Sequence, residues 1–117
     1  MIQRRWRGAV ATDKVDRYLE HQADTGVRDY RDTEGNLGVV VLRRDQGALT
    51  EVVTLSLWTS MAAVRRFAGD DPGTARFYPG DDDYLIEKDL HADHHEVVAS
   101  DLDAVLLHFT AAAPGPG

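Results

Sequence analysis

Two adjacent segments, residues 37–44 and 49–58, constrain the fold more than any other feature of this chain. Both are rich in Val and Leu, and the turn residues 45–47 (Asp-Gln-Gly) lie between them. This pattern predicts an antiparallel β-hairpin. Within the first segment, residues 39–42 place apolar side chains on both faces of the strand. A sheet built on this hairpin therefore needs a cover on each side.

The segments around the hairpin supply more elements. Residues 2–10 alternate in polarity and predict a first strand. Thr12 is predicted to N-cap a helix that stops at Gly26, and one face of this helix carries Val15, Tyr18, Leu19 and Gln22.

After the hairpin, Ser60 predicts the start of a second helix, whose buried stripe is Met61, Val64, Phe67 and Ala68. The Asp71-Pro72 pair predicts a short helix that runs through Tyr78. Residues 91–98 predict a fourth strand because Val97 and Val98 are β-branched.

The order β-α-β-β-α-β predicts an α+β fold of the ferredoxin-like, split type, with an antiparallel sheet and both helices on one face. Residues 1–98 complete this single domain. No layer remains for the other apolar face, so we expect a second copy to pack against it, sheet to sheet, in a homodimer.

Composition excludes several classes of function. The chain has 117 residues and no cysteine, which rules out disulfides, thiolate zinc sites and a cysteine nucleophile. Lys and Arg total 13 against 20 Asp and Glu, a net charge of −7. An acidic chain is a poor partner for nucleic acid or for an anionic membrane, and no apolar run is long enough for a signal peptide or a membrane span. We expect a soluble cytoplasmic protein.

Several short motifs together resemble the antibiotic biosynthesis monooxygenase (ABM) family. The strand ending at Trp58 runs through Thr59-Ser60 into the helix Met-Ala-Ala-Val-Arg-Arg-Phe-Ala and Gly69. Supporting pieces are Trp6-Arg7-Gly8, Glu34-Gly35-Asn36-Leu37-Gly38, Ala75-Arg76-Phe77-Tyr78-Pro79 and His94-His95-Glu96-Val97. The resemblance covers about residues 2–98 and implies a dimeric α+β barrel with a cavity between sheet and helices.

The resemblance also implies an activity. Family members include enzymes that oxygenate polycyclic phenols without a cofactor and enzymes that open haem oxidatively. The haem-degrading branch has an asparagine on its first strand and an axial histidine after the second helix. This chain has neither, because it reads Arg4-Arg5-Trp6 and Arg76-Phe77-Tyr78 at those places.

Candidate site residues follow from this resemblance and from strand alternation. Trp58 matches the tryptophan that borders the family's cavity, and His94 matches a recurrent histidine and has the pKa range of a general base. Tyr78 is a candidate proton donor and Arg4 a candidate oxyanion stabiliser. The expected substrate-binding residues are Thr54, Ser56, Trp6 and Phe67.

Simpler roles remain open for these residues. Thr54 and Ser56 fit ordinary strand hydroxyls, Tyr78 a packed aromatic, and His94 a structural hydrogen bond. His94 and His95 point to opposite faces of a strand, so only one of them can face the cavity.

The histidine cluster after residue 90 could indicate a metal site. On a strand, His91 and His95 lie about 13 Å apart, too far to share an ion. On a helix they would align with Glu87. The Asp81-Asp82-Asp83 run lacks the spacing of a calcium loop and is expected to be a solvated loop. No cofactor and no metal are expected.

Three functions remain from the sequence. The first is a cofactor-independent monooxygenase acting on a small aromatic or polyketide-like substrate. The alternative is a non-catalytic small-molecule binding or regulatory protein on the same fold, and haem degradation is a third.

The C-terminal segment is expected to lie outside this domain. Residues 99–110 form an extension, within which the apolar positions of 101–109 fit either a short helix or a fifth strand. We expect it to pack on the partner or on an edge of the barrel. Residues 111–117 are expected to be disordered.

Overall fold

A computed structural model describes residues 1–101 of the chain. Predictions for the segment from residue 102 onward lie outside the described residues. The elements, in chain order, are β1 (Ile2–Ala11), a 3₁₀ turn (Thr12–Lys14), α1 (Val15–Asp24), α2 (Gly26–Asp32), β2 (Asn36–Gln46), β3 (Leu49–Trp58), α3 (Met61–Ala68), a second 3₁₀ turn (Asp81–Asp83), β4 (Leu85–Lys88) and β5 (Asp93–Glu96). Within this part of the chain, no helix has both the length and the apolar character that a membrane crossing requires.

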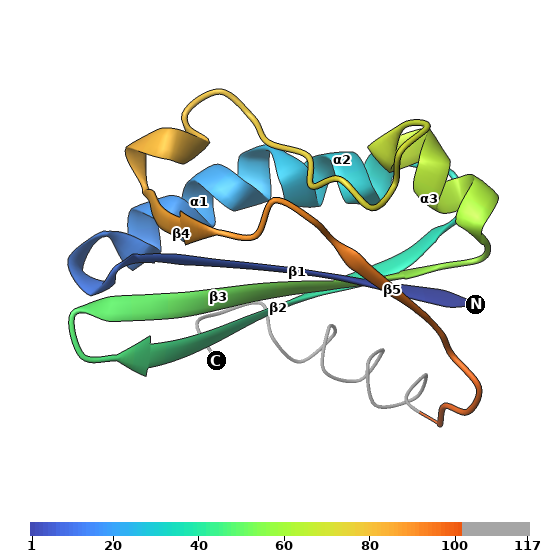
Figure 1. Cartoon of the computed structure of the whole chain (residues 1–117), viewed down its shortest axis with the longest axis horizontal. Coiled ribbons are helices and arrows are strands. Elements are labelled where there is room, and N and C mark those ends of the chain that lie inside the picture. The colour runs from blue at the N-terminus through green and yellow to red at the C-terminus, as the bar shows by residue number, and fades with distance from the viewer. Residues whose placement is uncertain (102–117) are drawn as a thin grey trace.

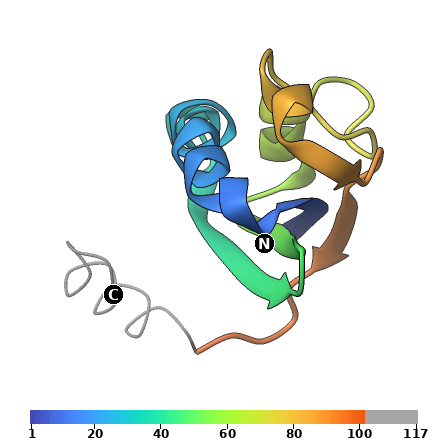
Figure 2. The ribbon, with the colours of Figure 1, turned by 90° about the vertical axis from the view of Figure 1, so that its left-hand side faces the viewer.

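One antiparallel sheet organises the molecule. Its strand order is β2-β3-β1-β4, and β5 also pairs with β1. Ten residue pairs join β1 to β3, whereas β4 and β5 pair with opposite ends of the remaining edge of β1. The helices lie together on one face of this sheet (Figures 1 and 2). The predicted α+β, ferredoxin-like fold is therefore confirmed.

The first helical region differs from the prediction. Thr12 caps no helix, because its hydroxyl donates to the carbonyl of Gly47 across the hairpin. Gly26 does not end the helix either. The break is at Thr25, whose φ and ψ are −118° and −92°, and α2 begins at Gly26. Gly26 packs against Tyr78, since an ideal Cβ on this glycine would lie 3.5 Å from the tyrosine ring, an ordinary van der Waals contact.

The segment after α3 also differs. Ser60 caps α3 as predicted, by accepting a hydrogen bond from the backbone of Ala63. No helix forms between Pro72 and Tyr78. Asp71 instead closes a turn, with its carboxylate accepting from the Thr74 hydroxyl at 2.8 Å. The expected strand at 91–98 is shorter than predicted, and β4 was not predicted at all.

The core between helices and sheet is divided in two. One cluster packs Tyr30, Ala63, Val64 and Phe67 around Trp58. The other joins Val10, Val15, Tyr18 and Val52. Between them, Thr54 on β3 and Gln22 on α1 occupy buried positions that are polar. Buried polar groups cost stability unless they are hydrogen-bonded. The polar region between the two core clusters is therefore a candidate location for a functional site.

The other face of the sheet carries no helix among the described residues (Figure 2). Val40 and Leu42 point to this side and are 37% and 45% exposed. On β3, Leu55 lies opposite Val40 and Val53 opposite Leu42, and Leu57 follows on the same face opposite Gly38. We call this apolar strip the open face.

Candidate functional site

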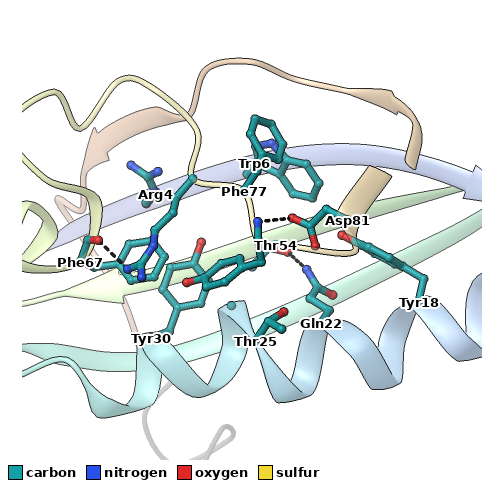
Figure 3. Close-up of a pocket in the computed structure, with 13 residues that line it drawn as sticks. Arg4, Trp6, Tyr18, Gln22, Thr25, Tyr30, Thr54, Phe67, Phe77 and Asp81 are labelled. Atoms are coloured by element: carbon teal, nitrogen blue, oxygen red, sulfur yellow. Dashed lines mark hydrogen bonds between the residues drawn. The ribbon is translucent and has the colours of Figure 1, made fainter. Parts of the chain in front are cut away.

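A pocket lies between the sheet and the helices, in the gap between the two core clusters (Figure 3). Its aromatic walls come from Trp6, Tyr18, Tyr30, Phe67, Phe77 and Tyr78. Its polar lining consists of Arg4, Gln22, Thr25, Thr54, Arg76 and Asp81. A largely aromatic cavity with a few polar groups is the usual form of a small-molecule site.

The pocket is narrow. The space open to the centres of water-sized molecules is about 40 Å³. One water needs about 10–15 Å³ measured in this way, so the pocket holds roughly three waters. An organic ligand therefore has to part the walls, and a single ring requires the least movement.

Arg4 is the most unusual residue in the lining, because its charged side chain is only 2% exposed. Its Nη1 donates to the carbonyl of Pro72 and to Nε2 of His94 at 3.0 Å. Its Nη2 donates weakly to the carbonyl of Thr74 at 3.4 Å. Strand β1 positions it, since every second residue of this strand faces the helices.

His94 lies beside Arg4 and does not line the pocket. The two residues are cross-strand partners on β1 and β5, and His95 pairs with Gln3 on the opposite face. Because Arg4 has only donors, Nε2 of His94 must accept and the imidazole is neutral. Burial and the Arg4 charge both lower the pKa of His94. His94 can hold Arg4 in place, but Arg4 lies between His94 and a ligand in the pocket.

Trp58 and Ser56 belong to the core. Trp58 is fully buried and packs against Tyr30 and Phe67. Its indole N–H donates to the Ser56 hydroxyl at 2.9 Å, so each satisfies a polar group of the other. Neither side chain lines the pocket. They support its wall from behind, through Tyr30 and Phe67.

Tyr78 lines the pocket, and its hydroxyl is already hydrogen-bonded to another residue. It donates to Asp29 at 2.8 Å, and Asp29 also pairs with Arg76 at 3.1 Å. Burial raises the pKa of Tyr78, and the hydrogen bond to Asp29 raises it further. The phenol is therefore held in its protonated form.

The remaining predicted binding residues all line the pocket. Thr54 accepts a hydrogen bond from Gln22 at 2.7 Å. Trp6 meets Phe77 edge to face, with 6.1 Å between ring centroids. The guanidinium carbons of Arg4 and Arg76 lie 5.7 Å and 4.9 Å from the centre of the Phe67 ring.

His21 and Asp81 form a pair that the sequence did not predict. Asp81 was expected in a solvated loop, but it is 9% exposed and lines the pocket. Its Oδ1 lies 2.7 Å from Nε2 of His21, and its Oδ2 accepts from the backbone of Tyr78 at 2.8 Å. The preceding Gly80, with φ of 94°, lets the His21 ring approach closely. Only the Pro79-Gly80 turn could have indicated that the first of three aspartates points inward.

Comparison with solved structures identifies the fold. A Bacillus cereus protein described as a candidate antibiotic biosynthesis monooxygenase aligns over 86% of this chain and 95% of its own, with a TM-score of 0.58 and 19% identity. A second antibiotic biosynthesis monooxygenase covers 85% of this chain and 100% of its own, with a TM-score of 0.60 and 16% identity. This chain has the ABM fold.

The ABM fold also occurs in a haem degrader. MhuD from Mycobacterium tuberculosis, solved with two haems bound in its active site, covers 86% of this chain and 99% of its own, with a TM-score of 0.55 and 16% identity. No family model and no curated protein match the sequence. The likeness is therefore one of fold.

On this ABM fold the pocket offers acid–base and hydrogen-bonding groups. Among residues 1–101, no three His, Asp or Glu side chains converge as metal ligands. The lining does bring one buried guanidinium and one buried carboxylate to an aromatic cavity. This arrangement can hold an aromatic molecule, stabilise negative charge on it and accept a proton from it.

Proposed function

We propose that this protein is an ABM-family monooxygenase that binds a small aromatic substrate in this pocket and oxygenates it with dioxygen, using neither metal nor flavin. The observation that carries the proposal is the buried guanidinium of Arg4 within an aromatic lining. The names of the two monooxygenase neighbours support the same activity.

The chemistry suits a substrate whose CH₂ group lies between an aromatic ring and a carbonyl. Loss of one proton gives a carbanion that transfers an electron to dioxygen and combines with it to form a hydroperoxide. Loss of water from the hydroperoxide leaves a new carbonyl. One oxygen atom enters the product, the other leaves as water, and the substrate supplies all the electrons.

Two pocket residues suit the steps of this reaction. Arg4 stabilises the developing anion in a site with little water. Asp81, paired with His21, is the carboxylate available in the lining to accept the proton. The narrow pocket favours one ring over a fused polycyclic system.

The test uses para-hydroxyphenylacetone as a one-ring probe and dithranol, whose acidic CH₂ lies between two aromatic rings that also flank a carbonyl, as a three-ring probe. With ¹⁸O-labelled dioxygen, we expect one labelled atom per product molecule and one dioxygen consumed, with the one-ring probe preferred. Arg4→Gln should lower kcat on the order of a hundredfold. Arg17→Gln, which removes an exposed charge on α1, should retain the activity. Oxygen uptake equal to that of the protein-free control would refute the proposal.

A second candidate is a binding protein without catalysis. It is favoured by the commitment of each proton-transfer group to a protein partner: His94 to Arg4, Tyr78 to Asp29 and Asp81 to His21. Saturable binding of the same probes without oxygen uptake would select this function.

Haem degradation has less support. The haem branch has an asparagine on its first strand, whereas this chain reads Arg4-Arg5-Trp6 there. The segment Arg76-Phe77-Tyr78 has no histidine that could serve as the axial ligand of haem. The pocket is also far smaller than a haem.

We also propose a homodimer formed through the open face. Val40, Leu42 and the neighbouring leucines of β3 offer a continuous apolar strip. Charged pairs border it, with Arg7 bonded to Glu51 at 2.6 Å. An apolar centre with a charged rim is typical of an interface between copies.

A further inference from the structure

Arg4 lacks a counter-ion. Among residues 1–101, no carboxylate lies within ion-pair distance of its guanidinium, whereas Arg7 and Arg76 are both paired. Its hydrogen bonds go to two carbonyls and a neutral imidazole, and it also interacts with the Tyr30 side chain and the Phe67 ring, none of which carries a negative charge. A buried charge without an opposite charge is costly, so a pocket that keeps one is suited to a ligand that brings the opposite charge.

The unused donors of Arg4 lie along one edge of the guanidinium. Both hydrogens of Nη1 are engaged, by Pro72 and His94. Nη2 has only the long contact to Thr74, and Nε is buried without any hydrogen-bond partner. Nε and Nη2 form the side of the guanidinium that binds both oxygens of a carboxylate. The free edge thus has the shape that a carboxylate fits.

The opposite end of the pocket differs in charge. Figure 3 shows Arg4 and Asp81 on opposite sides of the cavity, with Trp6, Phe77 and Thr54 between them. Asp81 is an acceptor that can take a hydrogen bond from a ligand hydroxyl. The aromatic walls between the two ends suit a flat ring.

We infer that the ligand of this pocket is a hydroxy-substituted aromatic carboxylate, with its carboxylate on the free edge of Arg4 and its hydroxyl donating to Asp81. The inference rests on the proposed aromatic-binding pocket and does not require oxygenation. It narrows the substrate class from aromatic molecules in general to aromatic acids.

The test is calorimetric binding of three one-ring probes to the full-length protein at neutral pH. Benzoate and benzamide have nearly the same shape and differ in charge. We expect benzoate to bind on the order of tenfold more tightly than benzamide, and para-hydroxybenzoate more tightly than benzoate. Equal affinities for benzoate and benzamide, or no binding of any probe, would overturn the inference.

Variants at Arg4 and Asp81 test which end of the pocket binds the carboxylate and which binds the hydroxyl. Arg4→Gln should abolish the preference for benzoate, Arg4→Lys should keep part of it, and Arg17→Gln should leave it unchanged. Asp81→Asn should remove the gain from the hydroxyl. If Arg4→Gln does not fold, the benzoate–benzamide comparison on the unmodified protein still decides. Because these measurements need no turnover, a protein that binds acids but consumes no oxygen would contradict only the proposed oxygenation.

Discussion

His94 shows how a residue chosen for one role serves another. The sequence suggested a general base, and the structure places its imidazole against the guanidinium of Arg4. A neutral ring that accepts from Arg4 fixes the direction of that side chain. His94 is therefore a positioning residue for the pocket.

This contact makes stability depend on pH. The pKa of His94 is lowered from 6.5 by burial first and then by the charge of Arg4, whereas Asp93 raises it and His95 lowers it by smaller amounts. In the unfolded chain the ring binds its proton at a higher pH than in the folded protein. Stability should therefore be complete above about pH 6.5 and decline as the pH falls through the folded pKa.

The measurement is the urea midpoint between about pH 7 and pH 5. His94→Gln retains an acceptor for Arg4 without titrating, so its midpoint should fall less steeply with decreasing pH. His91→Gln, at an exposed position, is the control and should follow the unmodified protein. Identical slopes for His94→Gln and the unmodified protein would contradict the assignment.

At the scale of elements, the turn from α2 into β2 depends on Gly35. Its φ is 93°, and its carbonyl accepts from Thr59 at 2.9 Å, so it lies between two elements. An ideal Cβ there would lie 2.5 Å from the Cβ of Ala63 and 2.9 Å from the hydroxyl of Thr59. Any side chain would push α3 away from the sheet.

Gly35→Ala and Gly47→Ala form a matched pair. Both place alanine at positive φ, but Gly47, with φ of 69°, has open space around it. Each should lose about 1 kcal/mol for the left-handed backbone. Gly35→Ala should lose about 1–3 kcal/mol more because of the steric overlap, as measured by urea denaturation. Equal losses would show that α3 adjusts freely.

The long elements could be predicted from sequence, and the short ones could not. β3 and α3 carry a period of two or 3.6 residues over eight or more positions, and β1 extends over ten residues that include alternating polarity at its start. β4 and β5 have four residues each and are held by pairing to β1, which a local pattern does not reveal. Asp71-Pro72 is a typical helix start, but the Asp71 carboxylate accepts a hydrogen bond from the Thr74 hydroxyl and a turn forms instead.

At the scale of the whole molecule, the open face leads to a prediction about assembly. Leu42→Glu places a charge in the middle of the apolar strip. Light scattering should give twice the monomer mass for the unmodified protein and the monomer mass for this variant. Leu90→Glu, a substitution at a 60% exposed leucine away from β2 and β3, should remain a dimer. A monomeric unmodified protein would refute the homodimer.

The pocket residues could be predicted from the sequence only in part, because the pocket is formed by segments that are far apart in the chain. Strand alternation correctly places Arg4, Trp6 and Thr54 on one face, and all three line the pocket. The same alternation places Ser56 and Trp58 on that face too, but α2 and α3 cover them. Asp81 and His21 meet across sixty residues of sequence, and this distance in the chain hides such a pair from any local pattern.

The unequal pairing of β1 has a consequence for how a ligand enters. Ten residue pairs bind β1 to β3, but only three join it to β4 and four to β5. The segment between α3 and β5, which carries the pocket residues from Arg76 to Asp81, is attached to the sheet by these two short ladders and by side-chain hydrogen bonds from Arg4 and Trp6. Local unfolding begins in the regions of a protein that have the lowest stability. We therefore expect a ligand to enter by displacing this segment while the three long strands stay in place.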